Sequence, residues 1–202
     1  MIVSHSSLSR RVAGVISIAA FIAIGVQTVI NEGNNPLVNL ALMLRYFTIW
    51  SIMAAAILLG WVALRGRLEA RIAFALATAL AMVGIVYHLL LSADHHPVGW
   101  DWYTNQMHHT VIPLATVFWW LAFSGVKATG WQTLPMVIAV PILYTGFALL
   151  VGATSGFYPY FFLDLPALGW GQLLINVVGL GLVFMAFGAL LMGMRKLITA
   201  RA

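Results

Sequence analysis

Six long apolar runs, separated by short polar or Gly- and Pro-rich connections, organise this chain. The runs cover residues 12–30, 40–63, 71–92, 108–124, 133–153 and 168–193. Each is close to the ~20 residues that a helix needs to cross a bilayer. The runs are uniformly apolar, without the alternation of barrel strands, and backbone in lipid must satisfy its own hydrogen bonds. The pattern predicts an all-α integral membrane protein: residues 1–202 form one bundle of six transmembrane helices.

Composition supports lipid as the solvent. Of the 202 residues, 62% are hydrophobic and only 7% are charged, which a soluble domain of this size does not show. The formal charge of +5 is explained better by membrane orientation than by nucleic-acid binding, so we expect membrane lipids as partners. The chain has no cysteine, which excludes disulfides, thiolate metal sites and a cysteine nucleophile.

Charge is distributed unequally between the two sets of connections. Four of the five acidic residues, Glu32, Asp94, Asp101 and Asp164, fall on one side. Nine of the ten basic residues fall on the other, and they predict cytoplasmic N- and C-termini in a multi-pass protein of a bacterial inner membrane. These nine are Arg10, Arg11, Arg65, Arg67, Arg71, Lys127, Arg195, Lys196 and Arg201.

Polar residues cluster near the outer ends of the second, third and fourth runs. Thr48 lies about eight residues inside the run 40–63 and therefore predicts a hydroxyl at membrane depth. Polar groups at that depth are costly and are typical of functional sites. We expect residues from all three runs to meet there. They are Arg45, Thr48 and Ser51, then Tyr87 and His88, then His108 and His109.

The outer connections add further candidates. Asn105 precedes the fourth run, and the last connection carries Tyr158, Tyr160 and Asp164 among several aromatic residues. This aromatic segment suits either a lid over a site or an ordinary belt at the headgroup level.

Four short motifs carry a resemblance to a known family. They are Arg45-Tyr46-Phe47-Thr48, Tyr87-His88, Met107-His108-His109-Thr110-Val111-Ile112-Pro113 and Tyr158-Pro159-Tyr160-Phe161-Phe162-Leu163-Asp164. In order and spacing, from the second run to the sixth, the chain resembles the androgen-induced membrane protein family. That family includes the androgen-dependent regulator of tissue factor pathway inhibitor.

The resemblance implies an activity and a pair of residues. The animal members are six-span threonine hydrolases that cleave fatty acid esters of hydroxy fatty acids. The family threonine corresponds to Thr48, and the family histidine, five positions before a proline, corresponds to His108. His109 departs from the usual hydroxyl residue and is the alternate base. Ser51 is followed by Ile52, where bacterial members often have Asn.

The chemistry fits these residue types. A threonine hydroxyl is a weak nucleophile and needs a neighbouring base, which a neutral histidine supplies. Donors for the oxyanion remain open among Arg45, Tyr87, His88 and Asn105. Asp101 and Asp164 are the nearest carboxylates to orient His108. We predict a lipid-ester hydrolase that acts on a long-chain ester without metal or cofactor.

Two other classes remain open on the sequence. The outer-end histidines are suited to a metal site or to axial ligation of a haem, although no metal motif is present. They are His88, His95, His96, His108 and His109. A non-enzymatic six-span scaffold, transporter or regulator is the second class. The sequence does not indicate an oligomeric state.

Overall fold

A computed structural model describes residues 1–31, 33, 35–124 and 131–200. Most of these residues are helical, in eight α-helices. The α-helices are α1 (Ser7–Ile30), α2 (Pro36–Met43), α3 (Phe47–Arg65), α4 (Ala70–Val86), α5 (Gly99–Gln106), α6 (Ile112–Phe123), α7 (Ala139–Ser155) and α8 (Leu165–Ala200). The other elements are strands β1 (Ile2–Ser4) and β2 (Arg67–Glu69), π-helices η1 (Tyr87–Leu91) and η3 (Met107–Val111), and 3₁₀ helices η2 (Ser92–Asp94), η5 (Trp131–Ile138) and η6 (Phe161–Leu163).

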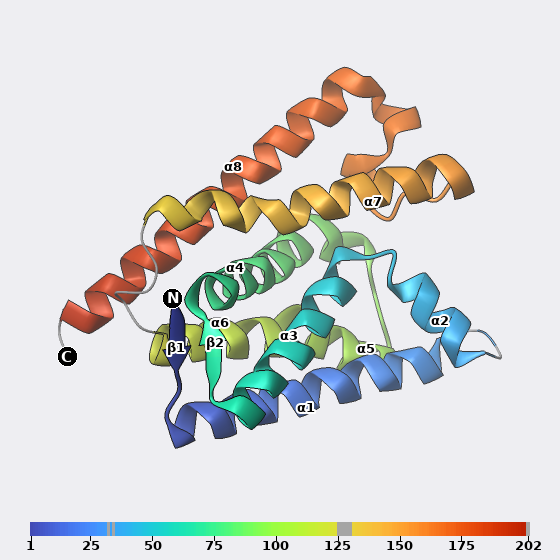
Figure 1. The fold of residues 1–202 in the computed structure, drawn as a ribbon. Helices are drawn as coiled ribbons and strands as arrows, with labels where there is room; N and C mark the ends of the chain where they lie inside the picture. The colour runs from blue at the N-terminus through green and yellow to red at the C-terminus, as the bar shows by residue number, and fades with distance from the viewer. Residues whose placement is uncertain (32, 34, 125–130, 201–202) are drawn as a thin grey trace.

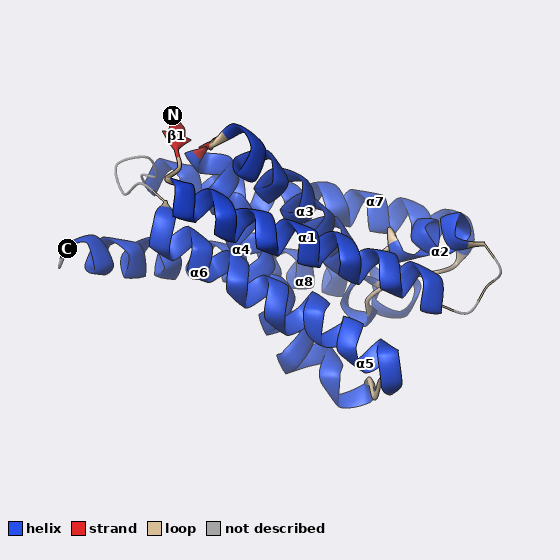
Figure 2. Cartoon of the chain, turned by 90° about the horizontal axis from the view of Figure 1, so that it is seen from below, coloured by secondary structure: helices blue, strands red, loops and turns tan. Residues whose placement is uncertain are grey.

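Helices α1, α3, α4 and α6 surround the main core, and α7 and α8 lie along one side of it, over α4 (Figure 1). Fully buried apolar residues fill the core, including Ile52, Leu59, Phe74, Leu80 and Trp120. A second, smaller cluster joins α7 and α8 to the start of α3 through Tyr144, Tyr160 and Leu173. Figure 2 shows the same helices from below, with α5 extending from the end of the bundle far from the N-terminus.

Five helical segments are long and apolar enough to cross a membrane, which is consistent with a multi-pass membrane protein. The predicted fourth span, 108–124, corresponds to the second part of a continuous helix from Gly99 to Phe123, which is not among these five. Its first half carries Asn105, His108 and His109, which lower its hydropathy. The five segments are Ser7–Ile30, Phe47–Arg65, Ala70–Asp94, Trp131–Ser155 and Leu165–Ala200.

Both ends of the described chain lie at the same end of the bundle (Figure 1). There, β1 pairs antiparallel with β2, and the Arg10 guanidinium donates to the carbonyls of Ala63 and Leu64. The Arg195 Nε donates to the Ser124 carbonyl at 2.8 Å and so ties α8 to the end of α6. The charge pattern also used Lys127, Arg201 and Glu32, which lie outside the described residues.

The predicted helix 40–63 is wrong in one respect, because the structure divides it into α2 and α3. Tyr46 between them has an extended backbone (φ −102°, ψ 135°). Side chains from elsewhere stabilise this break: the Tyr144 hydroxyl donates to the Arg45 carbonyl at 2.6 Å, and Trp50 Nε1 donates to the Leu44 carbonyl at 2.7 Å. A turn that includes Arg45 and Tyr46 therefore divides a run that the sequence pattern predicts as one helix.

Candidate functional site

Thr48 is the second residue of α3 and is buried. The prediction that it lies eight residues inside a helix fails, because α3 begins only at Phe47. The N-cap residue Tyr46 makes no side-chain cap bond, and the first N–H of the helix, on Phe47, donates instead to the hydroxyl of Tyr160. The second position of α3 places the Thr48 hydroxyl at the positive end of a helix dipole, a position that favours developing negative charge.

His109, the alternate in the sequence-based prediction, is the histidine that reaches Thr48. The Thr48 Oγ1 and the His109 Nε2 are 3.4 Å apart. The other ring nitrogen, Nδ1, is 3.2 Å from the backbone carbonyl of Asn105. A carbonyl can only accept, so we assign the proton to Nδ1 and leave Nε2 free to accept from the threonine hydroxyl. This is the tautomer that a general base requires.

A hydrogen-bond network fixes the imidazole of His109 in this position. The ring stacks on Tyr87, with centroids 3.8 Å apart and an interplanar angle of 17°. The Tyr87 hydroxyl accepts from the Asn105 side-chain amide at 2.7 Å and lies 3.1 Å from His95 Nδ1. Tyr87 and Asn105, both predicted as supporting residues, therefore orient the base, and their polar groups are already engaged with one another.

The facing residues Tyr87 and His109 both lie in π-helical turns, η1 and η3. Insertions of this kind are frequent at functional sites because they shift the register of side chains along a helix. Pro113 lacks an N–H, so it cannot donate to the carbonyl of His109 four residues earlier. That carbonyl lies where a Cβ on Gly84 would approach to 3.1 Å. Gly84 and Pro113 thus allow α4 and η3 to approach closely beside the site.

Tyr160, from the connection between α7 and α8, completes the surroundings of Thr48. Its hydroxyl accepts from the Phe47 backbone N–H at 3.1 Å, at the first residue of α3. Burial raises the pKa of the Tyr160 phenol to about 12, and its interaction with the Thr48 side chain opposes that rise. The phenol is therefore neutral at physiological pH and keeps a proton to donate.

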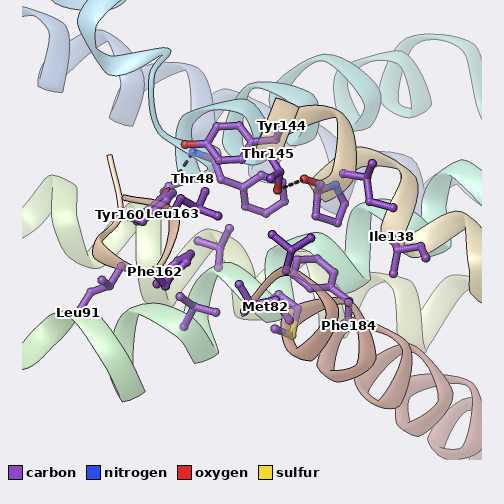
Figure 3. A pocket seen from close by; sticks show the side chains of 18 residues that line it. Thr48, Met82, Leu91, Ile138, Tyr144, Thr145, Tyr160, Phe162, Leu163 and Phe184 are labelled. Carbon is purple, nitrogen blue, oxygen red and sulfur yellow. Dashed lines mark hydrogen bonds between the residues drawn. The ribbon is translucent and has the colours of Figure 1, made fainter. Parts of the chain in front are cut away.

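Thr48 and Tyr160 stand where two cavities meet. A narrow apolar cavity of about 80 Å³ runs between α3, α4, α7 and α8 (Figure 3). A wider, more polar cavity of about 480 Å³ lies on the other side, and we call it the polar chamber. Leu91 is the third residue common to both cavities. The polar chamber is also lined by Gln27, Asn31, Tyr87, His95, Asp101, Asn105, His108 and His109.

His108, the predicted base, lines the polar chamber but has no described hydrogen bond to Thr48. Its Nε2 is buried and has no hydrogen-bond partner. Neighbouring residues on a helix point about 100° apart, so only one of His108 and His109 can face α3. Asp101, predicted as an orienting carboxylate, lines the same chamber and accepts from Gln27 Nε2 at 2.9 Å.

Other predicted site residues lie elsewhere. His88 is exposed and pairs with Thr110 at 3.0 Å. The Arg45 guanidinium lies 5.1 Å from the Phe157 ring centroid, outside α3, so it does not share a helix face with Thr48. Asp164, Tyr158 and Ser51 also line neither cavity. The Asp164 carboxylate accepts from the Ala167 backbone N–H, and Tyr158 packs on Gly152. The Ser51 Oγ is buried without a partner.

The histidines do not gather into a metal site. Across residues 1–31, 33, 35–124 and 131–200, no three His, Cys, Asp or Glu side chains are grouped so as to hold an ion. His108 lines the polar chamber, whereas His88 is exposed and lines neither cavity. Their geometry therefore gives the metal and haem alternatives no support.

Part of the wall of each cavity was not predicted from the sequence. Gln27 comes from α1, which carried no predicted site residue, and its amide reaches Asp101 across the polar chamber. The apolar cavity uses Ile138, Gly181 and Phe184, which look like ordinary membrane-helix residues in the sequence. Only the packing of α7 and α8 against α4 reveals them.

No protein-family model, curated protein or solved structure matches this chain. The resemblance to the androgen-induced membrane protein family therefore rests on the four motifs alone and stays a prediction.

Proposed function

We propose that the protein is an intramembrane lipid-ester hydrolase in which Thr48 is the nucleophile and His109 is the base. The observation that carries the proposal is the 3.4 Å approach of Thr48 Oγ1 to His109 Nε2 at the junction of an apolar and a polar cavity. Such a junction suits an ester, whose hydrocarbon and polar parts need different surroundings. Catalytic hydrogen bonds are often long before substrate binds, so 3.4 Å is compatible with proton transfer.

The reaction follows the two-step course of an acyl transfer. His109 Nε2 takes the hydroxyl proton as Thr48 Oγ1 attacks the ester carbonyl carbon. The oxyanion forms beside the first turn of α3 and the Tyr160 hydroxyl, which donates to it. The tetrahedral intermediate collapses, the ester C–O bond breaks, and His109 returns the proton to the departing alcohol. Water from the polar chamber then cleaves the acyl-threonine by the same steps and releases the acid.

The proposed setting is a six-span protein of a bacterial inner membrane, with both termini cytoplasmic and the site at the outer end. The nine basic residues on one side of the sequence support that orientation. The motif resemblance supports a fatty acid ester of a hydroxy fatty acid as the substrate class. No cofactor is needed for the steps described.

The test compares two hydroxyl deletions on the same helix, Thr48→Ala and Ser51→Ala. Release of fatty acid from a long-chain ester of a hydroxy fatty acid is measured with purified protein in lipid vesicles. We expect Thr48→Ala to lose roughly 10³-fold or more of the turnover, as nucleophile deletions do.

Ser51→Ala is the control. The Ser51 hydroxyl is buried without a partner and lines neither cavity, so its removal should leave turnover and folding nearly unchanged. Turnover that persists in Thr48→Ala at the wild-type level would contradict the proposal and favour a non-enzymatic role.

A further inference from the structure

The apolar cavity has polar groups mainly at one end. Thr48 and Tyr160 stand at that end, and Ile138 and Phe184 lie farther along toward the other (Figure 3). The remaining walls are almost wholly aliphatic or aromatic, from α3, α4, η5, α7 and α8. A cavity of this composition offers water few partners, whereas hydrocarbon fits it without loss.

The few polar groups along the cavity are satisfied within the protein. The Thr145 hydroxyl donates to the Pro141 carbonyl of its own helix at 2.8 Å. The Tyr144 hydroxyl donates to the Arg45 carbonyl at 2.6 Å. The polar groups along the cavity are therefore not available to a polar ligand. Those that could bind one lie at the Thr48 end.

The wall toward the membrane is thin. Ile142 lines the cavity and is still 55% exposed on the outside of the bundle. Helices α7 and α8 bury only 17% of their apolar windows, against 39–50% for the other three candidate spans. Ile142 therefore belongs both to the cavity wall and to the outer surface of the bundle, so displacing it would open the cavity to the hydrocarbon of the membrane.

We propose that this cavity is the binding site for the acyl chain of the substrate, with Gly181 as a determinant of chain length. At about 80 Å³ the cavity is smaller than a long acyl chain, so it would widen as the chain enters, by movement of the lightly buried helices α7 and α8. The inference rests on the proposed function for its polar end and names the part of the ester that the site holds. Gly181 lines the cavity, and a Cβ built on it meets no atom within 4 Å. Because Gly181 lines the cavity, a larger side chain there is expected to reduce the space for the acyl chain.

Gly181→Leu and Gly179→Leu form a matched pair. Gly179 lies two residues away on α8, has equally open space around a built Cβ, and does not line the cavity. Both changes add the same side chain and both raise helix propensity, so neither should impair folding.

The first measurement is covalent capture of a diazirine-bearing long-chain fatty acid in vesicles, with Thr48→Ala as the background. We expect labelled peptides from α7 and α8, at least tenfold less capture with Gly181→Leu, and unchanged capture with Gly179→Leu. Because the background lacks the nucleophile, this result is independent of catalysis. Equal capture by both leucine variants, or labelling confined to other helices, overturns the acyl site.

The second measurement is hydrolysis in the chain with Thr48 intact. We expect Gly181→Leu to lower turnover of long-chain acyl esters at least tenfold while keeping that of short-chain acyl esters, and Gly179→Leu to lower neither. Equal losses for both chain lengths contradict a role in chain-length selection. Two results together would separate the two proposals: Gly181→Leu loses capture, and Thr48→Ala keeps turnover. They would refute Thr48 as the nucleophile and still support the acyl site.

Discussion

His108 and His109 differ in the contacts that orient their imidazole rings. His109 has its Nδ1 held by the Asn105 carbonyl and its ring face held by Tyr87, so its Nε2 faces Thr48. His108 is more deeply buried, yet its Nε2 has no partner. A general base must be oriented as well as near, and only His109 meets both conditions.

This difference leads to a prediction for His109→Gln and His108→Gln. General bases contribute about 10² to 10⁴ in rate, so His109→Gln should lower turnover by at least about 10²-fold. His108→Gln keeps a polar side chain of similar size in the polar chamber and should retain turnover within about fivefold. Steady-state hydrolysis and the thermal midpoint of both proteins provide the measurement. A larger loss for His108→Gln at equal stability would restore His108 as the base.

The motifs favour His108 as the partner of Thr48, whereas the structure places the neighbouring His109 against it. The sequence places His108 and His109 together, and the spacing to Pro113 favours the former. The π-helical turn η3 changes the direction of both side chains, and the residues of that stretch do not predict such a turn. Which of the two histidines faces Thr48 is therefore visible only from the packing of η3 against α3 and α4.

At the scale of elements, the site depends on two local departures from regular helix. One is the break before α3, which presents the first turn of that helix to the cavities. The other is the pair of π-helical turns, which bring Tyr87 and His109 face to face. Both occur inside runs predicted as uninterrupted helix, although Arg45, His108 and His109 make these stretches more polar than the rest of the runs. That is why the long helices were predictable and these interruptions were not.

Gly84→Ala tests the importance of the π-helical turn. The added methyl would lie 3.1 Å from the His109 carbonyl, so η3 must move by a few tenths of an ångström. We expect about tenfold lower turnover, since small misplacements of catalytic groups are costly.

Gly25→Ala is the matched control, because a Cβ there meets nothing within 4 Å. It should raise stability by up to about 1 kcal/mol and leave turnover unchanged. Hydrolysis rates and thermal midpoints of both variants separate the two effects. Full activity in Gly84→Ala would argue against tight coupling between α4 and the base.

At the scale of the molecule, the candidate spans and the grouping of basic residues were predicted from hydropathy and charge along the sequence. The apolar runs predicted five of the candidate spans, while the helix holding His108 and His109 is too polar to be counted among them. The basic residues that the structure describes, Arg45 apart, gather at the end that holds β1 and β2 (Figure 1). Long apolar segments and charge asymmetry are properties of composition, so no tertiary information was needed for either.

The orientation can be tested cleanly because the chain has no cysteine. We expect Val98→Cys, 81% exposed between η2 and α5, to react with a membrane-impermeant maleimide in intact cells. Ile2→Cys, 66% exposed on β1, should react only after the membrane is permeabilised. The reverse pattern would place the site on the cytoplasmic side, and labelling of both in intact cells would contradict a spanning bundle.

Thr48 lies between an apolar cavity and a polar one, which would give the proposed reaction a direction. Cleavage of a neutral ester there would leave a carboxylate at the mouth of the apolar cavity, where an ion is poorly solvated. The anion would regain hydration by moving into the polar chamber and drawing its hydrocarbon tail after it. Hydrolysis would then deliver free fatty acid to the outer leaflet, and each turnover would empty the apolar cavity for the next chain.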